Sequence, residues 1–267
     1  MYYEKIYLQP GNENCYLETY VADKVTGFTR ESILVIPGGG YGSVCSEREG
    51  EPIALAFLPY GFNAFVLHYS VASDKKTFPA QLIEASLAIK HIKDNAEKYG
   101  INPDRVFACG FSAGGHLCAS LGTMWHKDEI YKETDMPYAY NKPTGVMLIY
   151  PVVSAKHTEG SFKNLLGEKY EIEKDRNESS IENNVDEKSS PAFILHTSND
   201  QVVDIKNSLV LAQAYADKKL MFEMHIYPDA PHGVALGNEI TRCGCEKWQN
   251  KSIAKWVENA VEWTKSI

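Results

Sequence analysis

The first candidate for chemistry in this 267-residue chain is a serine with glycines two positions before and two positions after it, in the segment Gly110-Phe111-Ser112-Ala113-Gly114. An apolar run typical of a buried strand, residues 105–109, precedes it, and a helical pattern follows. A tight turn between a strand and a helix raises such a serine above a sheet, and glycines let the backbones approach closely. The pattern predicts that Ser112 is a nucleophile. The alternative is an ordinary serine that caps the helix.

A serine hydroxyl is a weak nucleophile at neutral pH and needs an adjacent base. Among the eight histidines, His232 has the most suitable setting, in a proline-rich loop after the last predicted strand. His116 is one helical turn beyond Ser112, and we do not expect it to reach the hydroxyl. His196 and His225 fall within predicted strands. We therefore expect His232 to be the base, and the alternative is an ordinary loop histidine.

The base needs a carboxylate that holds its tautomer and stabilises the imidazolium. Asp200 follows the predicted strand 192–197, so it emerges at the same sheet edge as Ser112 and His232. Asp204, the alternative acid, is better placed to cap a helix, and Asp229 is too close to His232 along a rigid turn. The chain order serine, aspartate, histidine is the one expected on such a sheet.

Acyl transfer also needs hydrogen-bond donors for the developing oxyanion. The segment Pro37-Gly38-Gly39-Gly40-Tyr41 follows the apolar strand 32–36 at the same edge. Glycine can turn its N–H toward a substrate without a side chain in the way. We expect Gly39, Gly40 and Ala113 to supply the donors, and the alternative is a flexible turn.

The elements that must position these residues alternate between strand and helix. The patterns predict buried strands at 32–36, 63–67, 105–109, 145–150, 192–197 and 221–227, with two edge strands at 4–8 and 16–21. They predict helices at 49–59, 79–99, 113–124, 204–218 and 252–264, and a turn at 102–104. This alternation predicts an α/β fold, a mainly parallel sheet with helices on both faces. We expect residues 1–267 to form a single domain.

The polar stretch 152–190, rich in Glu, Lys, Asn and Ser, interrupts this alternation. We interpret it as an excursion, or small cap, over the carboxyl edge of the sheet, where α/β proteins bind ligands. The alternative is a solvated surface insertion without a role.

The composition fits an ordinary globular protein, with 44% hydrophobic and 23% charged residues. The net charge of −8 argues against nucleic acid or an anionic membrane as the main partner, because both attract basic surfaces. It suits a neutral small-molecule substrate. No apolar run of about 18 residues is present, and the N-terminal segment lacks the pattern of a secretory signal. We therefore expect a cytoplasmic protein, and a homo-oligomer is compatible with the sequence.

The six cysteines do not indicate a metal site. Cys109 and Cys118 lie in apolar segments and are expected in the core. Cys243-Gly-Cys245 has a spacing of one residue rather than two and no second Cys/His pair nearby. We expect free thiols, no metal and no cofactor.

Taken together, these motifs resemble the α/β-hydrolases, within the lipase/esterase group that carries an H-G-G-G oxyanion motif. The resemblance is greatest to small bacterial acetyl xylan esterase-like enzymes. The matching segments are 36–41, Arg48-Glu49-Gly50-Glu51-Pro52, 109–117, 196–200 and 231–233. Pro37 stands where the wider group has histidine. In the wider group that histidine shapes the loop and does not itself donate to the oxyanion, so we expect the oxyanion hole to form with proline at this position.

The resemblance implies a serine carboxylesterase acting on short acyl esters, notably acetylated sugars or xylo-oligosaccharides. Tyr41, beside the predicted hole, is a candidate for substrate contact. Aromatic residues after the nucleophile helix are candidates for sugar stacking: Trp125, Tyr131, Tyr138 and Tyr140.

The same machinery also suits a formamidase of the kynurenine formamidase type. A lipase is disfavoured because the sequence shows no apolar lid, and a peptidase because such enzymes usually carry a further domain. A non-catalytic scaffold is disfavoured because all three triad residues are present.

Overall fold

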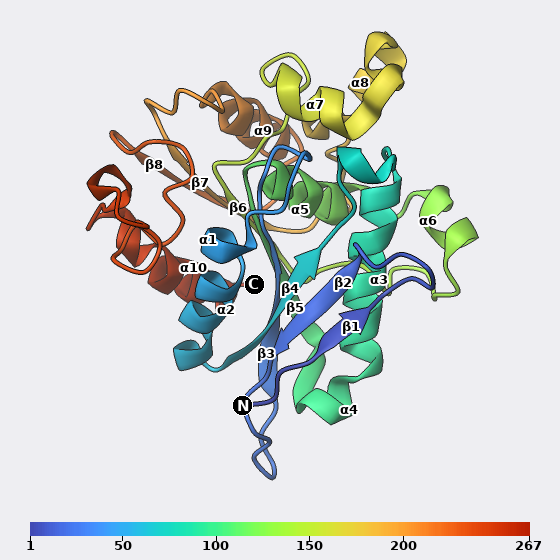
Figure 1. Ribbon diagram of the computed structural model, residues 1–267, viewed down its shortest axis with the longest axis vertical. Helices are drawn as coiled ribbons and strands as arrows, with labels where there is room; N and C mark the ends of the chain where they lie inside the picture. Colours follow the sequence, from blue (N-terminus) through green and yellow to red (C-terminus); the bar gives the residue numbers. More distant parts are fainter.

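The computed structural model describes residues 1–267, and one eight-stranded sheet organises them (Figure 1). Its strand order is β1-β2-β4-β3-β5-β6-β7-β8. The strands from β3 to β8 pair in parallel, and β1 and β2 add antiparallel pairs at one edge. The predicted mainly parallel sheet with an N-terminal edge is confirmed. The strands are β1 (Lys5–Tyr7), β2 (Tyr16–Tyr20), β3 (Arg30–Ile36), β4 (Phe62–His68), β5 (Ile101–Phe111), β6 (Val146–Ile149), β7 (Ala192–Thr197) and β8 (Phe222–Tyr227).

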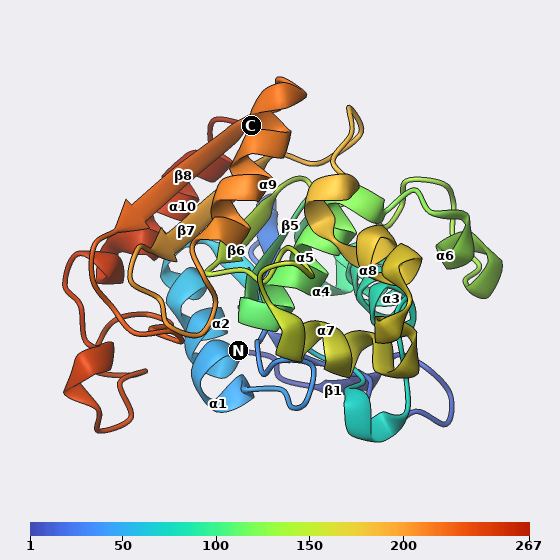
Figure 2. The same ribbon diagram turned by 90° about the horizontal axis from the view of Figure 1, so that it is seen from above.

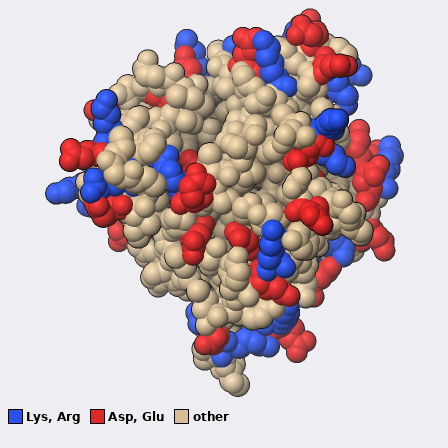
Figure 3. Space-filling model, in the orientation of Figure 1, with Lys and Arg blue, Asp and Glu red and all other residues tan.

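Helices cover both faces of this sheet (Figure 2). One face packs against α3 (Ala80–Asp94), α5 (Ser112–Met124) and α9 (Lys206–Asp217), and the other packs against α2 (Glu51–Phe57) and α10 (Trp256–Thr264). No helix is both long enough and apolar enough to cross a membrane. Acidic and basic side chains are interspersed over the face of the molecule shown in Figure 3. The remaining helices are α1 (Ser46–Glu49), α4 (Ala96–Tyr99), α6 (Asp128–Glu133), α7 (Glu159–Leu166) and α8 (Glu173–Ser179).

Strand β3 shows why a continuous apolar run predicted a buried strand. Successive side chains of a strand point to opposite faces. Leu34 and Ile36 therefore enter the core beneath α3 and α5, while Ile33 and Val35 enter the core beneath α2 and α10. All four are fully buried, as a strand covered on both faces requires.

Two local predictions need correction. The turn expected at 102–104 lies inside β5 as an irregularity, because Ile101 pairs with Arg30 but Val106 already pairs with Ser32. The helix predicted over 79–99 is divided at Asn95 into α3 and α4. These deviations lie at the amino end of β5, away from its carboxyl end.

The stretch 152–190 folds into α7, α8 and short 3₁₀ segments above the carboxyl ends of the strands (Figure 1). Phe162, Leu165 and Ile181 from this stretch are buried in the same core as α3 and α5. The Nδ2 of Asn164 donates a hydrogen bond of 2.8 Å to the carbonyl oxygen of Gly40. The stretch is therefore packed onto the body of the protein, and the alternative of a merely solvated insertion is wrong.

His116, on α5, joins this insertion to the loop that follows β3. Its ring is buried, with Nε2 at 2.8 Å from the carbonyl oxygen of Ser179 and Nδ1 at 2.7 Å from the hydroxyl of Tyr41. Because a carbonyl only accepts, Nε2 carries the proton and Nδ1 accepts from the Tyr41 hydroxyl. Burial lowers the pKa of His116 to about 4, although its bond to the Ser179 carbonyl acts in the opposite direction.

This buried imidazole predicts a loss of stability in acid. Between the ordinary pKa of 6.5 and about 4, the unfolded chain binds a proton on His116 that the folded chain does not. The free energy of unfolding should therefore decrease by about 3 kcal/mol from this group as the pH falls through that window. Urea unfolding of the wild type and His116→Gln at several pH values measures it. The variant should show a shallower pH dependence, and equal slopes would contradict the assignment.

Candidate active site

The candidate nucleophile lies at a strained turn between β5 and α5. Ser112 has φ 52°, in the left-handed region that non-glycine residues rarely adopt. A Cβ at Gly110 would lie 2.2 Å from the carbonyl oxygen of Gly114, and one at Gly114 would lie 2.2 Å from that of Ile36. Only glycine fits at both positions, so the sequence itself imposes the sharp turn that points the Ser112 hydroxyl into the site.

The structure brings the three residues predicted from the sequence into one hydrogen-bonded chain. His232 Nε2 lies 2.9 Å from Ser112 Oγ, and His232 Nδ1 lies 2.7 Å from Asp200 Oδ2. The other carboxylate oxygen of Asp200 accepts the backbone N–H groups of Val202 and Val203, at 2.9 and 3.0 Å. This geometry suits a hydroxyl that donates to an imidazole whose opposite nitrogen is held by a carboxylate.

The Asp200 carboxylate is held in its ionised form. Burial alone would raise its pKa, but hydrogen bonds from His196, His232 and the Val203 N–H outweigh that effect and lower the pKa below its usual range. His196 is fully buried, and its Nε2 lies 2.9 Å from the Val203 carbonyl oxygen and 3.5 Å from Asp200 Oδ2. His196 thus approaches the same carboxylate oxygen of Asp200 that His232 binds. Its role could not be read from its place within a predicted strand.

The rejected candidates have other contacts. The carboxylate of Asp204 accepts the N–H of Lys206 at 2.8 Å, and Asp204 lies one residue before Ile205, which occupies the N-cap position of α9. Asp229 accepts a hydrogen bond from Asn199. His116 is bound to Tyr41 and Ser179, so it does not act on Ser112.

The loop after β3 presents two unpaired donors beside Ser112. Gly39 and Gly40 line the cavity, and their N–H groups make no hydrogen bond within the chain. The N–H of Ala113 lies in the first turn of α5, where helical partners are missing. The loop is held in place by a bond of 2.8 Å from the Tyr69 hydroxyl to the Pro37 carbonyl oxygen. These positions suit an oxyanion hole, and the donor roles remain a prediction.

A cavity of about 520 Å³ opens in front of Ser112 and His232. The insertion contributes residues 157–161 to its wall, so it forms one side of the candidate site. Trp248, at the end of the short 3₁₀ helix Glu246–Trp248, also lines the cavity, and sequence analysis had not selected it. It lies in a polar segment without a periodic pattern. The only sequence feature that could have indicated a role at the site is the presence of a large aromatic residue in such a segment. The remaining lining residues are Cys45, Glu47, Arg48, Glu49, Val202, Val203 and Gly233.

The aromatic residues proposed for substrate contact lie elsewhere. Tyr41 is only 1% exposed, with its hydroxyl on His116, so the prediction that it contacts substrate is wrong in this structure. Its φ of 58° turns the side chain from the loop into the core. Trp125 and Tyr131 pack against Tyr138 near α6, with ring centroids 5.3 and 5.5 Å apart. None of this cluster, including Tyr140, lines the cavity in front of Ser112.

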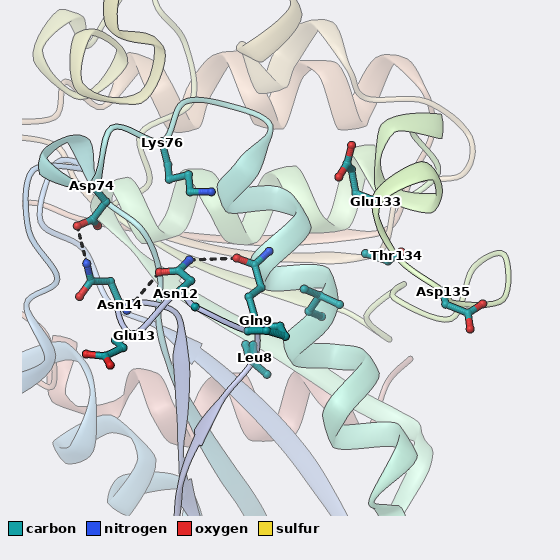
Figure 4. A pocket seen from close by; sticks show the side chains of 13 residues that line it. Leu8, Gln9, Asn12, Glu13, Asn14, Asp74, Lys76, Glu133, Thr134 and Asp135 are labelled. Atoms are coloured by element: carbon teal, nitrogen blue, oxygen red, sulfur yellow. Dashed lines mark hydrogen bonds between the residues drawn. The ribbon is translucent and has the colours of Figure 1, made fainter.

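A second, larger hollow lies near the N-terminal edge of the sheet (Figure 4). Its polar side chains bind one another: Asn14 donates to Asp74 at 2.7 Å, and Asn12 donates to Gln9 at 3.0 Å. No histidine lies beside a hydroxyl or thiol there. The hollow therefore lacks a nucleophile with its base, and Ser112 stays the candidate nucleophile.

The model of the BD-FAE family matches residues 17–215. The chain belongs to the BD-FAE family. It is 37% identical over 216 residues to endo-1,4-beta-xylanase B of Butyrivibrio fibrisolvens, covering 79% of this chain and 33% of that protein. It is 30% identical over 212 residues to an acetylxylan esterase of Xylanibacter ruminicola, covering 77% of this chain and 41% of that protein. The alignments thus cover about a third to two fifths of these curated relatives.

Solved structures show the same architecture over nearly the whole chain. The acetyl ester-xyloside bifunctional hydrolase from Caldicellulosiruptor lactoaceticus has a TM-score of 0.82 and 32% identity, covering 98% of this chain and 96% of that one. The α/β hydrolase MGS-M1 from a Medee basin deep-sea metagenome library has a TM-score of 0.81 and 31% identity, covering 100% and 97%. The α/β-hydrolase fold and the acetyl xylan esterase-like resemblance are confirmed.

The donor loop generates a prediction for a matched pair of glycine variants. A Cβ at Gly39, where φ is +127°, would lie 2.1 Å from the carbonyl oxygen of Ser43, whereas one at Gly40 would meet only Ser161 Oγ at 3.8 Å. Gly39→Ala must therefore displace the loop, and we expect kcat/KM on an activated acyl ester to fall about 100-fold or more. Gly40→Ala should lower the free energy of unfolding by about 1 kcal/mol, and its loss of activity should be much smaller than that of Gly39→Ala. Equal activity in the two variants would contradict this role of the loop.

Proposed function

We propose that the protein is a serine carboxylesterase that hydrolyses short acyl esters, with acetyl esters of sugars or xylo-oligosaccharides as its substrates. The observation that carries this proposal is the chain from Ser112 Oγ through the imidazole of His232 to the buried carboxylate of Asp200, with contacts of 2.9 and 2.7 Å. The unpaired N–H groups beside the hydroxyl support acyl transfer in particular. Membership of the BD-FAE family agrees with ester hydrolysis.

The proposed reaction has two steps. In the first, His232 takes the proton of Ser112 as the oxygen attacks the acyl carbonyl, and the N–H groups of Gly39, Gly40 and Ala113 bind the oxyanion. The protonated imidazole gives that proton to the departing alcohol, and an acyl-enzyme remains. In the second, His232 takes a proton from water, which attacks the acyl group. Collapse of this intermediate returns the proton to Ser112 and releases the carboxylic acid.

The sugar part of the proposal is supported by Trp248 and by the comparisons. Trp248 is a half-buried indole that lines the cavity and is held by its Nε1–H, which donates to the His232 carbonyl oxygen at 3.1 Å. A fixed aromatic ring suits the apolar face of a sugar. Two proteins similar to this chain are named as acting on acetylxylan or on acetyl esters and xylosides. We propose that residues 1–267 act as one domain, with 152–190 as its cap.

The nucleophile is tested with p-nitrophenyl acetate. The wild type should hydrolyse it, and Ser112→Ala should lower kcat by at least about 1,000-fold, because the covalent route is removed. N-formylkynurenine, assayed in parallel, tests the formamidase alternative. A faster reaction with the formamide would favour that alternative, and undiminished ester hydrolysis by Ser112→Ala would refute the mechanism.

The sugar-binding role is tested by two variants of Trp248. Trp248→Phe keeps an aromatic face but loses the N–H that holds the His232 loop, whereas Trp248→Leu loses both. We compare kcat/KM on acetylated xylo-oligosaccharides with that on p-nitrophenyl acetate. Trp248→Leu should lower this ratio by about 10-fold through loss of ring contacts. Trp248→Phe should lower kcat/KM on both substrates and leave the ratio of the two kcat/KM values unchanged. An unchanged ratio in both variants would show that Trp248 does not contact the sugar.

A further inference from the structure

The adjacent residues Arg48 and Glu49 have no part in the proton transfers above, yet they line the cavity. Glu49 is the last residue of α1 and is only 4% exposed. Its two carboxylate oxygens have different partners: Oε2 accepts the N–H of Gly38 at 2.8 Å, and Oε1 accepts the hydroxyl of Tyr150 at 2.8 Å. A buried carboxylate is costly unless it is hydrogen-bonded in this way. One of its partners directly precedes the predicted oxyanion donors.

Tyr150 connects this carboxylate to the loop of the base. Its hydroxyl oxygen accepts the N–H of Ala235 at 3.0 Å, three residues beyond His232. Its ring meets the imidazole of His232 edge-on, with centroids 4.9 Å apart and planes at 64°. Glu49 therefore holds the oxyanion loop directly and the His232 loop through one side chain.

Arg48 also holds the histidine loop. Its guanidinium donates to the carbonyl oxygens of Gly233 and Thr241, and its Cζ lies 3.5 Å from the ring centroid of Trp248. Trp248 in turn donates its Nε1–H to the carbonyl oxygen of His232. Both neighbouring side chains thus hold the histidine loop, Arg48 directly at Gly233 and Glu49 through Tyr150, and Glu49 also holds the oxyanion loop.

We propose that Arg48 and Glu49 are a positioning pair that fixes the oxyanion loop and the His232 loop relative to each other. We further propose that the Glu49 charge stabilises the imidazolium formed on His232 during the reaction. This inference rests on the proposed esterase function. Both neighbours of the carboxylate donate to it, so the site satisfies the ionised form, whereas a protonated Glu49 would need an acceptor for its own proton. Burial raises the pKa of Glu49, so this support is lost at a higher pH than for an exposed glutamate.

Several other charged or titratable groups lie near His232, and among them only Asp200 is hydrogen-bonded to its imidazole, whose other nitrogen faces Ser112. His196 lies 3.5 Å from the same Asp200 oxygen, Oδ2, and the ring of Tyr150 packs on the imidazole. Arg48 lies under Trp248 with its guanidinium on the histidine loop. The cavity wall adds Glu47, His157 and Glu159. Glu49→Gln changes the charge of one of these groups while it keeps the size of the side chain and an oxygen that can accept from Gly38.

The test compares full pH profiles of kcat/KM for p-nitrophenyl acetate in the wild type and in Glu49→Gln. We expect Glu49→Gln to lower kcat by at least about 10-fold with a smaller change in KM, because the transition state rather than the substrate carries the imidazolium. Its acidic limb should move to lower pH by roughly half a pH unit or more, since removing a negative charge lowers the pKa of a nearby imidazolium. Tyr150→Phe, which breaks the same link without changing a charge, should lower kcat without that shift of the limb.

The matched control is Glu84→Gln. Glu84 is also a buried carboxylate with a raised pKa, but it accepts from the N–H and hydroxyl of Ser70 and lies outside the cavity. It should lose stability and keep the wild-type pH profile. If Glu49→Gln behaves like Glu84→Gln, with lower stability but the wild-type kcat and acidic limb, the positioning pair is refuted while the esterase proposal stands. If the wild type itself shows no hydrolysis, the esterase proposal fails and this inference fails with it.

Discussion

The whole site depends on the fact that parallel strands end at a common edge of the sheet. Strand β3 leads into the loop with Gly39 and Gly40, β5 into Ser112, β7 into Asp200 and β8 into the loop of His232. Residues that are more than a hundred positions apart in the chain therefore come within hydrogen-bonding distance, as His232 and Ser112 do at 2.9 Å. Nothing in the local sequence of any one loop produces this arrangement. The apolar strands between the two helix layers fix it.

Burial gives the polar groups at this edge their chemical character. The side chain of Asp200 is almost completely buried, yet its carboxylate stays ionised. It is hydrogen-bonded to His232 and to the N–H groups of Val202 and Val203, and His196 lies 3.5 Å away. The N–H groups of Gly39 and Gly40 are left without partners beside Ser112, the candidate nucleophile. A fixed negative charge behind the base and unpaired donors before it are what an enzyme needs to stabilise a proton on the imidazole and an oxyanion on the substrate. The insertion helps to hold the loop that carries Gly39 and Gly40. Asn164 binds this loop directly at Gly40, and Ser179 binds it indirectly through His116, which contacts Tyr41.

Features that follow from strand order could be predicted from the sequence. Asp200 and Gly39 were found because each comes directly after a buried apolar run, and Ser112 because only glycine fits around its turn. Tyr41 was placed wrongly because the direction of one side chain depends on a left-handed backbone angle that no periodic pattern reveals. Trp248 was missed because contacts with Arg48 and His232 set its position at the site. Neither contact follows from a pattern in the sequence around Trp248. The helices of the insertion were missed for a similar reason, since packing of Phe162 and Leu165 stabilises a segment whose composition is mainly polar.

The central claim, that Ser112 is activated by His232 and Asp200, is tested most directly by covalent labelling. The full-length protein is treated with a fluorophosphonate at neutral pH, and the modified peptide is located by mass spectrometry. We expect one adduct, on Ser112, that forms much more slowly in His232→Ala and Asp200→Asn although both variants remain folded. Labelling on another residue, no labelling of the folded wild type, or an unchanged rate in both variants would contradict it.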